Sequence, residues 1–265
     1  MSLIRFLKRI YQYRAIIKAM AVREIQSRYV GTLAGLSWSV MQPLAMILVY
    51  WFVFSVGFKV QPQGNIPFIV VFLCGLIPWL MFTEALSTSA NAICANPHLI
   101  TKTVFPTEIL PIVYITVSLI THAVILFIFI IVMLFNRIGF SFYNLQFLYF
   151  LFALSVFSLG FGWLLSSLNV FYKDIGQILG VILNMWFWLT PIVWPLEILP
   201  QKFQMIIKLN PFFYIVDGYR NSFIYHVPIW HNLKEGVYFW AVCMFVFIAG
   251  ALIFKKLKPE FAETL

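Results

Sequence analysis

Six long apolar runs divide the chain, with short polar or proline-rich connectors between them. They cover residues 36–57, 68–86, 109–135, 145–168, 175–194 and 237–254. A helix needs about 20 predominantly apolar residues to cross the hydrocarbon core of a bilayer. The pattern therefore predicts an all-α integral membrane protein, with six transmembrane helices in a single domain over residues 1–265.

Composition agrees with this pattern and excludes a soluble domain. Of the 265 residues, 62% are hydrophobic and 10% are charged, and the mean hydropathy is +0.93. A soluble domain has roughly 45–50% apolar and about 25% charged residues. The three cysteines form no CxxC pair, so we expect small packing residues and no metal site. In a membrane protein, a net charge of +9 is explained by the uneven distribution of Lys and Arg between the two sides of the bilayer. We therefore do not expect nucleic acid as a partner.

An even number of crossings places both termini on one side of the membrane. The first 37 residues hold seven of the 18 Lys and Arg residues, and Lys255, Lys256 and Lys258 follow the last run. Because positive charge accumulates on the cytoplasmic side, both termini are expected in the cytoplasm. The connector at 95–108 is then cytoplasmic, and the long segment 195–236 is extracytoplasmic.

Residues 1–35 form an interfacial arm. Its apolar side chains recur at helical spacing with basic residues between them, which predicts an amphipathic helix lying in the interface. Glu24 and Arg28 are spaced to pair at i, i+4. The arm is either a topology anchor or the border of a lateral opening for a lipid-linked anion.

The connector at 95–108 carries more apolar side chains than a water-exposed loop needs. Asn96 can cap a short helix that begins at Pro97 and ends before Pro106. Its apolar face comprises Leu99, Ile100, Val104 and Phe105. Such a face predicts a helix seated in a groove on another protein. A short interfacial helix resting on lipid is the alternative.

The segment 195–236 is apolar but interrupted by prolines. Its pieces at 202–209 and 212–225 are too short or too charged to cross, so they predict two short helices. Asp217 and Arg220 are spaced to pair at i, i+3 within the second piece. We interpret the segment as a lid over a pathway, with a structural cap as the plain alternative.

Aromatic residues make up 19% of the chain, and two of them stand inside the fifth run. The rings of Trp186 and Trp188 are candidates to stack on the C–H faces of sugars along a pore. Ordinary packing or an interfacial belt is the alternative for each ring. Glu84 and His122 are the polar residues most deeply placed in the runs. We expect Glu84 to reach the membrane edge and His122 to be a satisfied core residue.

These pieces in this order resemble the permease subunits of type-2 ABC exporters, in the branch that exports polysaccharides. The matching stretches are REIQSRYVGTLAGLSWSVMQP at 23–43, NPHLITKTVFPTEILP at 96–111, NVFYKDIGQIL at 169–179, FWLTPIVWP at 187–195 and LNPFFYIVDGYRNSF at 209–223. The resemblance covers nearly the whole chain.

The resemblance implies a division of roles. Two copies of the chain would form the pore, and two separate ATPase subunits, which bind ATP and Mg²⁺, would dock beneath it. The chain itself would hold no cofactor and catalyse no reaction. The substrate would be a polyprenyl-pyrophosphate-linked, O-antigen-like polysaccharide, exported across the bacterial inner membrane.

The resemblance also assigns residues. Residues 96–106 match the coupling helix, which adds Lys102 to the connector residues already named. Residues 23–38 match the cytoplasmic gate region, with Arg23, Arg28, Tyr29 and Trp38. Residues 196–226 match the external gate helices, with Asp217 and Arg220. Guanidinium groups suit phosphate, so Arg23 and Arg28 are candidates to meet the lipid pyrophosphate. A positive-inside anchor is the equal alternative for both.

The sequence itself supports ATP binding by a separate chain. No GxxxxGK[ST] motif occurs, and the chain contains no Gly-Lys dipeptide, so it cannot build a phosphate-cradling P-loop. A type-2 ABC permease for capsule, teichoic acid, a drug or a small lipid remains an alternative. A membrane-embedded polyprenol sugar transferase is a distant one, because it needs clustered acids to hold a metal and the acids here are scattered.

Overall fold

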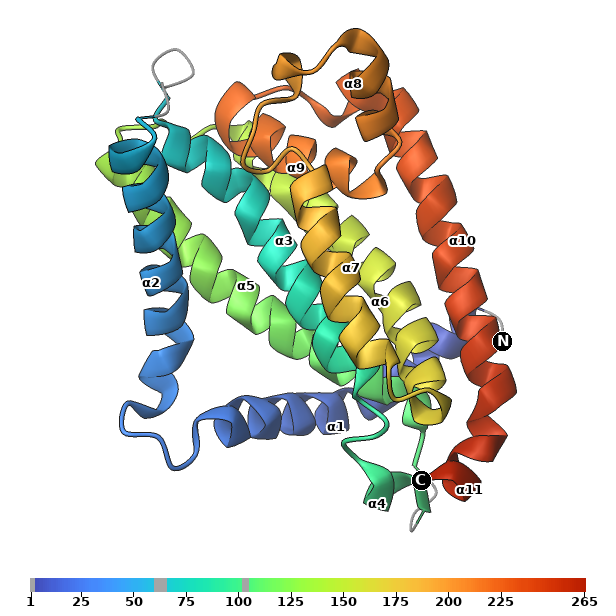
Figure 1. Ribbon diagram of the computed structural model, residues 1–265. Helices are drawn as coiled ribbons and strands as arrows, with labels where there is room; N and C mark the ends of the chain where they lie inside the picture. Colours follow the sequence, from blue (N-terminus) through green and yellow to red (C-terminus); the bar gives the residue numbers. More distant parts are fainter. Residues whose placement is uncertain (1–2, 60–65, 102–104) are drawn as a thin grey trace.

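The protein is a helical bundle (Figure 1). The computed structural model describes residues 3–59, 66–101 and 105–265, and these residues contain no β-sheet. This confirms the all-α membrane fold expected from the apolar runs. The helices are α1 Leu3–Tyr29, α2 Trp38–Trp51, α3 Phe68–Ala90, α4 Pro97–Thr101, α5 Leu110–Phe135, α6 Phe147–Phe171, α7 Ile175–Leu189, α8 Gln201–Lys208, α9 Pro211–Arg220, α10 Leu233–Leu257 and α11 Phe261–Thr264.

Five of the six predicted crossings are helices long and apolar enough to span a bilayer. They are Trp38–Gly57, Phe68–Ala90, Thr107–Phe135, Phe142–Phe171 and Ile229–Thr264. The first of them continues beyond α2 as a π-helical stretch, Phe52–Gly57.

The fifth predicted crossing, 175–194, is shorter than expected. Its helix α7 ends at Leu189 after 15 residues, which is about 22 Å at 1.5 Å per residue and less than the roughly 30 Å hydrocarbon core. Thr190 leaves the helix with φ −96° and ψ 134° because Pro191 follows it, and a residue before proline is disfavoured in helical conformation. The predicted end of this run at 194 is therefore wrong.

Helix α3 is the centre of the bundle. Of its most apolar window, 83% is buried, and it packs against α5, α6, α7 and α9. The side chains of Phe72, Ile77 and Phe82 are completely buried in the main apolar cluster. Phe82 stacks on Phe157 of α6 with ring centroids 5.7 Å apart.

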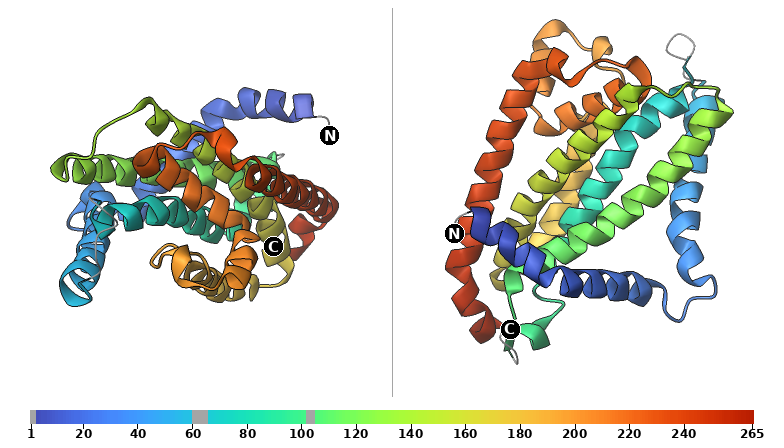
Figure 2. Two further views of the ribbon diagram at one scale, coloured as in Figure 1. Left: turned by 90° about the horizontal axis from the view of Figure 1, so that it is seen from above. Right: turned by 180° about the vertical axis from the view of Figure 1, so that it is seen from behind.

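Helix α2 stands away from this centre, and only 6% of its span is buried (Figure 1). It contacts α5 along part of its length, and its exposed side chains are apolar apart from Gln42 in its first turns, as a membrane environment favours. Helix α1 lies across one end of the bundle and packs on α5, and in the view from behind it runs in front of the other helices (Figure 2). Ile17 and Ala21 of α1 are buried against Val113 and Val117 of α5.

The two ends of the bundle differ. We call the end that carries α4 and α11 the α4 end, and the opposite end the α8 end. The C-terminus lies at the α4 end (Figure 1). The segment 195–236 lies at the α8 end and contains the two short helices expected for it, α8 and α9.

Helices α6 and α10 make the closest contact between crossings, at Gly160 and Gly250. A Cβ atom on Gly250 would overlap the carbonyl oxygen of Gly160, and one on Gly160 would lie 2.8 Å from the Cα of Phe247. Small residues let helix backbones approach in membranes, where interhelical packing is a main source of stability.

We therefore expect Gly250→Ala to destabilise the protein by about 1–3 kcal/mol, the usual cost of overpacking. Thermal unfolding of the detergent-solubilised protein measures this. Gly180→Ala on α7 is the matched control, because a Cβ there meets nothing within 4 Å. Equal melting temperatures for the two variants would contradict the close approach.

Candidate functional site

The connector between α3 and α5 contains a shorter helix than the sequence suggested. Helix α4 covers Pro97–Thr101, and the predicted coupling residues Lys102 and Val104 lie outside the described residues. Asn96 precedes the helix, and its side-chain amide donates to the carbonyl of Ala92 at 3.0 Å and to the hydroxyl of Tyr114 at 3.2 Å. These bonds hold the start of α4 to the turn after α3 and to α5. Pro106 precedes the short turn Thr107–Ile109 that leads into α5.

The apolar side of the connector packs on the chain itself. Leu99, Ile100 and Phe105 are partly buried against a cluster that includes Phe261 of α11, which is completely buried. Phe261 also contacts Phe254 of α10, with ring centroids 5.4 Å apart. The chain thus covers part of this apolar face itself, and Val104 of the same face lies outside the described residues.

The exposed side of α4 is instead polar. His98 and Thr101 are exposed, and they project from a helix that the C-terminal segment supports from behind. An ion pair of 2.6 Å between Lys258 Nζ and Glu108 Oε2 joins the end of α10 to the start of α5 beside this support.

A charged cluster joins the end of α1 to the bundle. Arg28 donates to Glu84 of α3 and also lies 3.5 Å from Glu24, the expected i, i+4 partner. Thr121 of α5 donates to the same Glu84 oxygen at 3.3 Å. Glu84 therefore pairs with Arg28 and Thr121, a set of partners that the sequence did not suggest.

The two arginines of the predicted gate region differ in how accessible their guanidinium groups are to a ligand. Arg28 is held by two carboxylates, whereas Arg23 is exposed and forms no ion pair with any residue that the structure describes. Tyr29 is half-buried at the end of α1, and Trp38 is exposed at the start of α2. Arg23 is thus the guanidinium that remains accessible to an anion.

The two tryptophans of α7 also differ. Trp186 is partly buried, its ring lies beside Trp79 and Phe82, and its N–H donates to Asn210 at 2.8 Å. Trp188 is 58% exposed. Its ring meets that of Phe187 edge to face at 5.4 Å, so of the two tryptophans Trp188 is the one accessible to a ligand, and Trp186 anchors α7 to α3 and α9.

The polar residue His122 is buried in the core, as expected, but only one of its ring nitrogens has a hydrogen-bond partner. Its Nε2 lies 3.2 Å from the hydroxyl of Tyr219 on α9, whereas its Nδ1 bonds to none of the residues that the structure describes. This bond joins the middle of α5 to the helix that walls the cavity described next.

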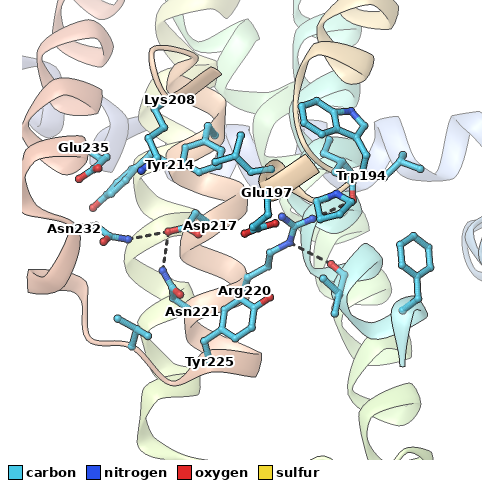
Figure 3. Close-up of a pocket in the computed structure, with 18 of the residues that line it drawn as sticks. Trp194, Glu197, Lys208, Tyr214, Asp217, Arg220, Asn221, Tyr225, Asn232 and Glu235 are labelled. Atoms are coloured by element: carbon cyan, nitrogen blue, oxygen red, sulfur yellow. Dashed lines mark hydrogen bonds between the residues drawn. The ribbon is translucent and has the colours of Figure 1, made fainter. Parts of the chain in front are cut away.

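A cavity of about 630 Å³ opens at the α8 end (Figure 3). Its walls come from α3, the 192–197 segment, α9 and the start of α10. Asp217 and Arg220 both line it, but among the described residues they do not form the i, i+3 ion pair that their spacing allowed. Asp217 Oδ2 accepts hydrogen bonds from Asn221 and Asn232, each 2.8 Å long.

Arg220 has different partners. Its Nη2 donates to the carbonyl of Ile192 at 3.1 Å, and its Nε donates to the carbonyl of Val71 at 3.5 Å. It therefore joins α9 to α3 and to the turn after α7. Burial raises the pKa of Asp217 above its usual value, although the nearby charge of Arg220 lowers it.

Sequence reasoning missed several members of these sites. Asn232 and Glu235 belong to the start of α10, and Lys258 follows its end, so no local pattern connects them with Asp217 or Glu108. The spacing of Asp217 and Asn221 at i, i+4 was the one available signal, and it is typical of a side-chain hydrogen bond on a helix.

The arrangement thus combines membrane-crossing helices, a connector helix at one end and a polar cavity at the other. The sequence pattern of the ABC-2 type transporter family matches residues 16–224, which is most of the chain. The chain belongs to the ABC-2 type transporter family.

Named relatives of this ABC-2 chain match over most of their length. One is the O-antigen export system permease protein RfbA of Myxococcus xanthus, 27% identical over 99% of this chain and 100% of the relative. Another is the RfbA permease protein of Klebsiella pneumoniae, 29% identical over 92% of each chain. The polysialic acid transport protein KpsM of Escherichia coli is 25% identical over 79% of this chain and 81% of its own.

Proposed function

We propose that this chain is the membrane-spanning subunit of an ATP-driven exporter that moves a lipid-linked polysaccharide across the bacterial inner membrane. The observation that carries the proposal is the similarity to the RfbA permease protein of Myxococcus xanthus, which extends over 99% of this chain. The cargo is a polyprenyl-pyrophosphate-linked, O-antigen-like glycan. Both termini and the α4 end face the cytoplasm, in keeping with the positive-inside rule.

The ATP that drives export is hydrolysed by other chains. Because this sequence has no P-loop motif, two separate ATPase subunits bind ATP and Mg²⁺, and two copies of this chain form the pore. The exposed side of α4, with His98 and Thr101, meets the ATPase. The apolar side of α4 packs on α11 and on the start of α5, so a displacement of α4 acts directly on the bundle.

The pyrophosphate of the lipid meets the α4 end. Arg23 is the candidate contact, since it is exposed and without an ionic partner among the described residues, whereas Arg28 holds α1 to α3. A planar guanidinium forms bidentate bonds to phosphate oxygens, which supports this role.

Deletion of the gene tests the proposal directly. We expect the surface polysaccharide to disappear and the finished lipid-linked glycan to accumulate inside the cell, and the wild-type gene to restore export. Normal surface polysaccharide in the deletion strain would refute an export role.

Capsular polysaccharide is a second candidate cargo, supported by the similarity to KpsM. The same deletion strain distinguishes the two, because loss of O-antigen and loss of capsule are read on separate gels. Loss of capsule alone would replace the O-antigen-like assignment.

The two tryptophans of α7, Trp186 and Trp188, provide a further prediction. Trp188→Leu should shift the chain-length profile of the exported glycan and change thermal stability much less than Trp186→Leu, because the ring is 58% exposed and meets only the neighbouring ring of Phe187 among the described ring contacts. Trp186→Leu should lower stability by about 2–4 kcal/mol, because it removes a packed ring and its bond to Asn210. Gel profiles of the exported glycan and thermal unfolding measure the two effects. An unchanged profile for Trp188→Leu would remove this ring from the export path.

A further inference from the structure

The cavity at the α8 end has the size of a small-molecule site. Its volume of about 630 Å³ lies within the 300–1,000 Å³ typical of ligand pockets. It is lined by residues from the end of the first crossing, α3, the 192–197 segment, α8, α9 with the residues after it, and the start of α10, and its polar side chains converge from opposite walls (Figure 3).

Two of these polar side chains are fixed and still have bonding capacity. Asp217 uses Oδ2 for the two amide donors, Asn221 and Asn232, and within the described part of the chain its Oδ1 accepts no hydrogen bond. Arg220 uses Nε and Nη2 for backbone carbonyls, which leaves Nη1 without a partner among the described residues. The cavity thus presents one immobilised acceptor and one immobilised donor to a ligand.

The charges in the cavity argue against an anionic ligand. Its carboxylates are Glu197, Asp217 and Glu235, its permanent cations are Lys208 and Arg220, and the imidazole of His231 also lines it. An excess of carboxylates repels phosphate and pyrophosphate, whereas carboxylates and amides bond well to hydroxyl groups, which both donate and accept.

Aromatic rings complete the lining. Tyr214, Trp194 and Tyr225 belong to the cavity wall, and the side chain of Tyr225 is exposed. Ring faces pack against apolar C–H surface, while polar groups at their edges bond to water or hydroxyls. Rings next to fixed carboxylate, amide and guanidinium groups suit an uncharged, hydroxyl-rich ligand with apolar faces, which is a description of a sugar.

We propose that this cavity binds a sugar residue of the glycan after the glycan has passed to the α8 end. The inference rests on the proposed export function and adds to it a glycan-binding site within each copy of the chain. A residue held there resists movement of the glycan back through the membrane, so successive binding events favour outward movement.

Site-specific crosslinking in living cells tests the proposal with the complete exporter. The residue p-benzoylphenylalanine replaces Tyr225 in the cavity wall, or Tyr238, an exposed tyrosine on α10 outside the cavity, as the matched control. After illumination, the tagged chain is purified and probed with an antiserum against the surface glycan of the same strain.

We expect a glycan ladder on the chain modified at position 225, no ladder at position 238, and no ladder in a strain unable to begin glycan synthesis. In the strain that makes glycan, Asp217→Asn should weaken the ladder about tenfold, the loss expected when a charge-assisted hydrogen bond is removed. Glu197→Gln, at an exposed residue, provides a second variant if Asp217→Asn fails to accumulate in the membrane.

Failure of the inference is distinct from failure of the proposed function. Export that depends on the gene, without a ladder at position 225, would overturn the sugar site and leave the export function intact. Equal ladders at both positions, or crosslinks at 225 to lipid alone, would also overturn it. Normal surface glycan after deletion of the gene would overturn both.

Discussion

Thr101→Arg should abolish export and the co-purification of the ATPase while the chain still inserts and folds. Thr101 is exposed at the end of α4, so the larger, charged side chain fits without disturbing the apolar cluster behind the helix. A mismatched side chain in a protein interface costs about 2 kcal/mol, which is roughly a thirtyfold loss of affinity. Affinity purification of the tagged chain and a gel of surface polysaccharide measure the two losses.

The control must add the same charge elsewhere at the α4 end. Gln26→Arg, at an exposed position on α1, should leave both the ATPase complex and export unchanged. Substitutions at Leu99 or Phe105 are less informative, because these side chains pack on α11 and on the start of α5, and their loss destabilises the chain itself. A Thr101→Arg chain that retains its ATPase and exports normally would exclude α4 as the contact.

The pair of Arg28 and Glu84 should show strong thermodynamic coupling. Removing one partner of a buried ion pair typically costs 3–5 kcal/mol, since the other charge is left without compensation. The two side chains are 24% and 19% exposed, so we expect about 2–4 kcal/mol for Arg28→Met or Glu84→Met alone. The double variant should lose less than either single one, because two apolar side chains of similar length replace both charges.

Unfolding of the solubilised chain by heat or denaturant measures this cycle. Arg23→Met is the control, since Arg23 is exposed and without an ion pair in the described part of the chain, and we expect a change below about 0.5 kcal/mol. Additive losses in the double variant would show that the two residues stabilise the protein independently, and α1 would then be held mainly by Ile17 and Ala21.

The sequence determined the helices and their order. A crossing must be apolar over a length that the bilayer sets, so the runs at 68–86 and 109–135 could be identified by length alone. Proline and polar residues likewise located α4 and the two short helices α8 and α9. The end of α7 was misplaced because an apolar run continues past Thr190 although Pro191 terminates the helix.

The tertiary structure alone decided which side of each helix faces the protein. In a soluble helix, the polar side identifies solvent, but in a bilayer the lipid-facing and core-facing sides are both apolar. The sequence therefore gave Trp186 and Trp188 the same role, although one is packed and the other exposed.

Polar partners that are distant in sequence could not be predicted from the sequence either. Arg28 and Glu84 are 56 positions apart, and Asp217 bonds to Asn232, 15 positions away, but forms no ion pair with the nearby Arg220 among the described residues. Spacing along one helix can suggest a pair, but the rotation of a second helix decides whether a better partner is within reach. Helix lengths and order follow from the solvent around the chain, whereas the pairs that form the candidate sites follow from how these helices are rotated against each other.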